Sequence, residues 1–93
     1  MPKRIDANQN EIVKTFRSLG ASVLIISSIP KCCDLVVGKN KRNYLVEVKD
    51  GKKPPSARQL TPHEQIFHDS WRGQICIVNS IEDVIALVNE MSL

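Results

Sequence analysis

The apolar positions of this chain follow two periods in turn, one helical and one extended. Residues 7–19 repeat apolar side chains three and four positions apart, which predicts an amphipathic helix that Asp6 caps and Gly20 ends. The inner face of this helix is expected to carry Ile12, Val13, Phe16 and Leu19. Residues 21–28 are a continuous run rich in β-branched residues, which is typical of a strand. The chain therefore opens with a helix followed by a strand.

The middle of the chain predicts a hairpin. Short apolar strands are expected at 34–38 and 44–50, and a compact loop at 39–43 would make them antiparallel. The consecutive residues Pro54 and Pro55 exclude a long regular element from the segment that follows the second of these strands.

The last third predicts a strand between two helices. Thr61 and Glu64 have the spacing of a capping box, with Pro62 at the first helical position, and Gly73 is expected to end that helix. Apolar residues then predict a strand and, after it, a final helix capped by a serine. The strand is expected at 74–79 and the helix at 80–91, with Ile81, Val84, Ile85 and Val88 facing inward.

The predicted order, α-β-β-β-α-β-α, describes an α/β fold with a mixed sheet and helices on its faces. A chain of 93 residues with 42% apolar content suits one hydrophobic core, so we expect a single domain over residues 1–93. No apolar stretch approaches the length of a membrane span, and the first ten residues lack the apolar segment of a signal peptide. The sequence predicts a cytoplasmic protein without a membrane partner, whose three cysteines are reduced and structural.

Positive charge is concentrated in one part of the sequence. Eight Lys and Arg residues but only three acidic residues lie between positions 31 and 58, although the whole chain has a net charge of +3. Such a patch favours a polyanion such as nucleic acid, and a solvated lysine-rich loop is the alternative. The candidate nucleic-acid-contacting residues are Lys39, Lys41, Arg42, Lys52, Lys53, Ser56 and Arg58. For the last two, contact with phosphate and simple loop solubility are equally open.

Two carboxylates occupy unusual positions in the predicted hairpin. Asp34 begins the first strand, and Glu47 and Lys49 lie on one face of the second, where strand interiors disfavour charge. An acid from each of two adjacent strands with a nearby lysine suits metal-assisted phosphodiester hydrolysis. Mg²⁺ binds one or two carboxylates and completes its shell with water and phosphate. A half-exposed sheet face with an ordinary Glu–Lys pair is the alternative.

The run Asp34…Glu47-Val48-Lys49 after a helix that contains Glu11 resembles the PD-(D/E)XK nuclease superfamily. The segments "DLVVG", "YLVEVKDGKKPPSARQLTPHEQIFHDSWRG" and "IVNSIEDVI" are similar to small phage and bacterial VRR-NUC-like nucleases, which are related to Holliday-junction resolvases. The resemblance implies a restriction-endonuclease-like core in a bacterial or phage-infected cell. One departure is visible: "IPKCC" stands where the family has a glycine-rich turn and a proline before the aspartate.

The resemblance also implies roles for individual residues. Asp34, Glu47 and the Val48 carbonyl would bind Mg²⁺ or Mn²⁺, and Lys49 would be the catalytic lysine. Glu11 would complete the metal site, and Gln65 would be a further catalytic residue near it. These roles describe a metal-dependent endonuclease acting on DNA.

We expect cleavage to be selective for DNA structure, such as a junction, flap or branch, because no base-reading motif is visible. Cutting two strands would suit a homodimer. The alternative function is a catalytically inactive nuclease-fold module that binds nucleic acid or a protein partner.

Overall fold

The computed structural model describes residues 6–93 and confirms the predicted order of elements. The elements are α1 (Gln9–Ser18), β1 (Ser22–Ile25), β2 (Leu35–Lys39), β3 (Arg42–Val48), the 3₁₀ turn η1 (Pro55–Arg58), α2 (Pro62–Ser70), β4 (Ile75–Val78) and α3 (Ile81–Met91). The diproline segment holds only the short 3₁₀ turn. No helix within these described residues is both long and apolar enough to cross a membrane.

The four strands form one mixed sheet in the order β1-β2-β3-β4. The first three strands pair antiparallel, whereas β3 and β4 are parallel because the chain crosses over through α2 between them. The turn between β2 and β3 holds Asn40 and Lys41 at positive φ angles of 53° and 64°. Two such residues form the tight hairpin turn whose twist matches the flanking strands.

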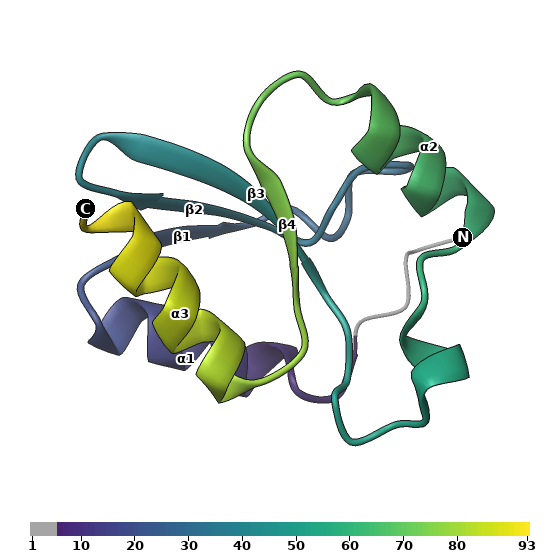
Figure 1. Cartoon of the computed structure of the whole chain (residues 1–93), viewed down its shortest axis with the longest axis horizontal. Helices are drawn as coiled ribbons and strands as arrows, with labels where there is room; N and C mark the ends of the chain where they lie inside the picture. The colour runs from purple at the N-terminus through teal and green to yellow at the C-terminus, as the bar shows by residue number, and fades with distance from the viewer. Residues whose placement is uncertain (1–5) are drawn as a thin grey trace.

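Helices α1 and α3 lie side by side and cover one face of the sheet (Figure 1). The core between helices and sheet consists of Ile12, Val13, Phe16, Ala21, Val23, Leu35, Val37, Val46, Val48, Val78, Val84, Leu87, Val88 and Met91. Helix α2 lies apart from this helical layer, and none of its residues is fully buried (Figure 1). The chain thus has one helix-covered face, and α2 leaves most of the other face open.

Four local predictions about the helices are wrong. Helix α2 ends at Ser70 and not at Gly73. Helix α1 begins after Asn8, which makes no side-chain capping bond, and not after Asp6. Leu19 follows the last residue of α1, so it leaves the buried face and is 38% exposed. On α3, Ile85 is 45% exposed because the buried stripe runs through other positions. That stripe consists of Val84, Leu87, Val88 and Met91.

The open face of the sheet carries an apolar row. The strand register aligns Leu24 with Val36, Val36 with Leu45, and Leu45 with Ile75 across all four strands. Leu24 is 65% exposed. Because side chains two positions apart share a face, Glu47 lies on this face too, one step along β3. The charged residues of interest therefore adjoin an uncovered apolar surface.

Candidate active site

Asp34 and Glu47 come together where the hairpin strands β2 and β3 meet the open face. Leu35 pairs with Val46, so Asp34 just before it and Glu47 just after Val46 are opposite each other. Only 3% of Asp34 and 1% of Glu47 are exposed to solvent. Burial of two carboxyl groups is costly without compensating partners, so this pair is a candidate functional site.

A chain of polar contacts fixes Asp34. The Val48 N–H donates to Asp34 Oδ2 over 2.8 Å, and the Ser27 hydroxyl lies 3.4 Å from Oδ1. Ser27 Oγ in turn accepts from Gln9 Nε2 over 3.1 Å. Gln9 is itself buried, and this contact links α1 to the carboxylate. This network holds the Asp34 carboxylate against the end of β3.

Glu64 contacts the site from α2, and the sequence did not predict this contact. Its Oε1 lies 2.7 Å from Lys49 Nζ, and a side-chain hydrogen bond joins it to Glu47. The same oxygen accepts from the Thr61 N–H over 2.8 Å, which completes the predicted capping box. Its capping spacing was visible in the sequence, but nothing there indicated that the carboxylate also reaches β3.

These contacts control the ionisation of Glu64. Burial works to raise its pKa, but the hydrogen bonds from Lys49 and from the Thr61 N–H, together with the bond to Glu47, outweigh it. The pKa of Glu64 consequently falls from 4.5 to about 2. The charged form of Glu64 is therefore favoured by folding.

We predict an acid-dependent loss of stability that requires Glu64. Because the folded-state pKa is lowered, its contribution is complete above about pH 4.5 and disappears as the pH falls toward 2. We expect it to be about 1–2 kcal/mol, less than the full shift implies because water reaches part of the ion pair. Urea unfolding in EDTA should show that Glu64→Gln costs stability at pH 7 and much less at pH 3. An equal cost at both pH values would contradict this account.

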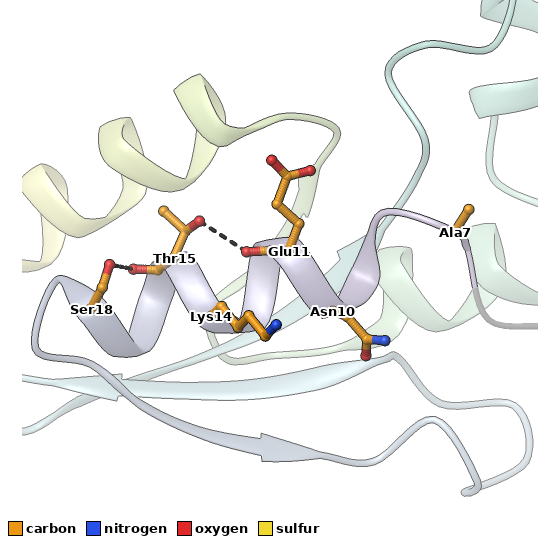
Figure 2. Close-up of a pocket in the computed structure, with 6 residues that line it drawn as sticks. All are labelled: Ala7, Asn10, Glu11, Lys14, Thr15 and Ser18. Atoms are coloured by element: carbon orange, nitrogen blue, oxygen red, sulfur yellow. Dashed lines mark hydrogen bonds between the residues drawn. The ribbon is translucent and has the colours of Figure 1, made fainter.

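The structure does not bring Glu11 to the two strand carboxylates. Glu11 is exposed on α1 and lines a recess together with Asn79, Ile81 and Glu82 near the start of α3. Figure 2 shows the Glu11 side chain pointing away from α1, among the residues that line a surface pocket. That pocket is lined by Ala7, Asn10, Glu11, Lys14, Thr15 and Ser18. Gln9, which lies two positions earlier and hence on another side of the helix, takes the inward position.

Gln65 also lies outside the site. Its side chain is exposed and donates to Asp69 Oδ1 on the same helix over 2.8 Å. The side chain one position earlier, Glu64, makes the contact with Lys49 instead. Neighbouring helical positions differ by about 100° in direction, so only one of the two can face β3.

The predicted basic patch is divided between the two ends of β3. Lys39, Lys41 and Arg42 lie at the hairpin turn, roughly 16 Å from Glu47 by the rise of five strand residues. Arg42 donates to the carbonyl groups of Glu90 and Leu93, at and beyond the end of α3, where a cation is favoured by the helix dipole. The hairpin end thus has a structural task in this fold.

The remaining basic candidates follow β3 on the side of the carboxylates. Lys52 and Lys53 precede η1, and Ser56 and Arg58 lie within it. Lys53 is partly engaged, because its Nζ lies 3.7 Å from Asp6 Oδ1. These four residues are the part of the predicted patch that follows the strand end carrying Glu47. Lys52 lines the same recess as Glu11.

The donor set suits a hard divalent ion bound by few protein ligands. Within residues 6–93, no three or more His, Cys, Asp or Glu side chains form a group that could hold a metal ion. A closed zinc cage would need such a group. Mg²⁺ does not, because it takes one or two carboxylates and fills the other positions with water and substrate phosphate. Asp34 and Glu47 fit that pattern.

The three cysteines fall into two classes. Burial, together with the carboxylates of Glu90 and Asp83, raises the pKa of Cys76 to about 12. Cys76 is partly buried and packs against the hydrophobic core. Cys32 and Cys33 lie in a turn and not on a strand, and their sulfur atoms are 3.9 Å apart.

One comparison with known proteins supports the fold described above. No protein-family profile matches the chain, and no curated protein matches it. A solved structure described as a VRR_NUC domain is similar over 87% of this chain and 89% of its own, with 25% sequence identity and a TM-score of 0.64. The chain therefore has the VRR-NUC-like nuclease fold that its sequence resembles.

Proposed function

We propose that this protein is a Mg²⁺- or Mn²⁺-dependent endonuclease that hydrolyses phosphodiester bonds in DNA. The observation that carries the proposal is the pair of buried carboxylates, Asp34 and Glu47, with Lys49 beside them at the end of β3. Such a group is costly to fold, and a divalent ion with a phosphate offsets that cost. The likeness to a VRR_NUC domain supports the same chemistry.

Each residue has a distinct task in this proposal. Asp34 and Glu47 hold the ion. The Val48 carbonyl is a further candidate ligand, because the N–H of Val48 already donates to Asp34. When bound, the ion stabilises negative charge on the phosphate and makes water more acidic. Lys49 orients the attacking water and balances charge as the phosphorus–oxygen bond breaks. Glu64 holds the Lys49 ammonium in place.

DNA structure, and not base sequence, is the proposed basis of substrate choice. Lys52, Ser56 and Arg58 lie in the loop that follows β3, where they can contact the phosphate backbone. Contacts of this kind position the nucleic acid but do not read its bases. We therefore propose a branched substrate such as a flap or a four-way junction.

The open face of the sheet supports the proposed homodimer. The row Leu24, Val36, Leu45 and Ile75 crosses the whole sheet beside the site. A second copy that covers this row would place two active sites on one assembly, as cleavage of two strands requires. Light scattering of the protein, alone and with junction DNA, should show a dimer that Leu24→Glu disrupts. A monomer under both conditions would contradict the dimer.

A non-cleaving nucleic-acid-binding module is the second candidate. The observation in its favour is the 2.7 Å ion pair with Glu64, which engages the ammonium that hydrolysis would need. In that case Asp34 and Glu47 would be remnants of an older site, and the loop after β3 would still bind the backbone.

Cleavage of a labelled substrate panel separates these two functions. The panel contains linear duplex, nicked, flap, four-way-junction and single-stranded DNA, each with Mg²⁺, Mn²⁺, Ca²⁺ or EDTA. We expect cutting of branched DNA with Mg²⁺ or Mn²⁺ and none with EDTA, because the two carboxylates alone cannot activate water. Binding without cutting under every metal would overturn the nuclease and favour the binding module.

A further inference from the structure

Two thiols lie in contact directly before Asp34. Cys32 Sγ and Cys33 Sγ are 3.9 Å apart, which is within the range of a weak sulfur hydrogen bond. Cys33 is fully buried, whereas Cys32 is partly exposed. A dissolved oxidant can therefore reach one sulfur while the other stays within reach of it.

We infer that Cys32 and Cys33 form a reversible disulfide under oxidising conditions, and that its closure displaces Asp34 and turns the site off. The effect on cleavage rests on the proposed nuclease function. Formation of the disulfide and displacement of Asp34 do not, since both follow from the turn that precedes β2.

The reaction needs a peroxide as oxidant and proceeds in two steps. The Cys32 sulfur attacks one peroxide oxygen, the O–O bond breaks, and sulfenic acid forms with release of one water. The Cys33 sulfur then attacks the sulfur of Cys32, the S–O bond breaks, and a second water leaves with the thiol proton. The two sulfurs supply the two electrons that the peroxide accepts, so the exchange balances.

The geometry of adjacent cysteines makes this disulfide easy to reduce. Consecutive Cα atoms are about 3.8 Å apart, which is closer than the roughly 4.4–6.8 Å that disulfides usually span. A bond formed at this separation strains the peptide between the two residues. Strained disulfides are more readily reduced than structural ones and are typical of regulatory sites.

Asp34 receives this strain directly because it is the next residue. Its N–H donates to the Val46 carbonyl over 3.1 Å, and its own carbonyl accepts from the Ile26 N–H over 2.8 Å. Its carboxylate accepts from the Val48 N–H over 2.8 Å. Closure of the disulfide changes the backbone angles between Cys32 and Cys33. This change moves Asp34 relative to the hydrogen-bond partners named above. The aspartate therefore cannot keep its position opposite Glu47 when the ring closes.

The test treats the whole metal-free protein with stoichiometric hydrogen peroxide and follows mass and amide resonances. We expect a mass loss of two hydrogen atoms per chain, reversed by dithiothreitol, with shifts of the Asp34 and Val48 amide signals. Cys32→Ser should abolish both changes. Cys76→Ser should leave both intact, because the raised pKa of Cys76, about 12, keeps its thiol protonated and unreactive.

Cleavage is measured in parallel with the reduced and oxidised forms. We expect oxidation to abolish cutting by wild type and by Cys76→Ser, and to spare Cys32→Ser. Oxygen addition at Cys32 without disulfide formation would overturn the inference, as would a disulfide that leaves the Asp34 and Val48 signals unmoved. If the disulfide forms and these signals shift, yet the reduced protein cuts nothing with any metal, the proposed nuclease fails and the displacement of Asp34 stands.

Discussion

Replacing Lys49 with alanine is expected to lower the rate of DNA cleavage by about 10²- to 10⁴-fold, the range typical for loss of a group that assists proton transfer. The reason is the position of Lys49 beside Glu47, where an ion pair with Glu64 holds its ammonium. The Nζ atom of Lys49 lies 2.7 Å from Glu64 Oε1. DNA affinity should change little, since Lys49 is only 9% exposed and cannot make a wide contact with the backbone. Single-turnover kinetics and a binding assay in Ca²⁺ would measure the two effects separately.

Two further variants make this result interpretable. Lys41→Ala removes the same charge at the hairpin turn, which lies at the far end of β3 from the carboxylates, and should cut at the wild-type rate. Asp34→Asn keeps an oxygen that accepts from the Val48 N–H but removes the negative charge. It should fold normally and lose cleavage in every metal. Full activity of Lys49→Ala or Asp34→Asn would refute the proposed site.

The fold could be predicted because its signals are local. The capping box of α2 is complete within four residues, Thr61 to Glu64, and forms as predicted. The tight turn at Asn40 and Lys41 needs only the two strands on either side of it. The period-two pattern of β3 placed Glu47 and Lys49 on one face for the same reason. Each of these features depends on neighbours in sequence.

The helical part of the site could not be predicted, because it depends on how each helix is rotated against the sheet. A difference of one position decides between Glu64 and Gln65 on α2, and two positions separate Gln9 from Glu11 on α1. On each helix, both competing residues are polar and able to bind a ligand. Residue type alone therefore cannot tell which of the two faces the site. Packing of apolar side chains sets the rotation, and the polar residues take whichever direction results.

Charge density along the sequence was also a poor guide to charge density in space. The basic residues around β3 are close in sequence, yet an extended strand separates them by its full length. Arg42 then contacts carbonyl groups at and beyond the end of α3, which no local pattern near the hairpin suggests. Of the predicted patch, only the residues after β3 follow the strand end that carries Glu47.

Replacing Glu64 with alanine is expected to lower the rate of cleavage by about 10- to 100-fold, as is usual for residues that hold a catalytic group in place. Glu64 contacts Lys49 and Glu47 from α2, so its loss frees the ammonium to take other rotamers. The proposed DNA-contacting residues lie elsewhere, in the loop after β3. The effect should therefore appear in kcat, with the affinity for DNA unchanged.

Glu64→Gln distinguishes positioning from a merely structural role. Its amide oxygen can still accept from Lys49 and from the Thr61 N–H, so it should keep the helix start and regain much of the lost rate. Thr61→Ala is the matched control, because it removes a side-chain cap of the same helix without touching Lys49. It should lower stability and leave kcat near the wild-type value. Faster cleavage by Glu64→Ala would contradict the positioning role. It would mean that the ion pair with Glu64 inhibits Lys49.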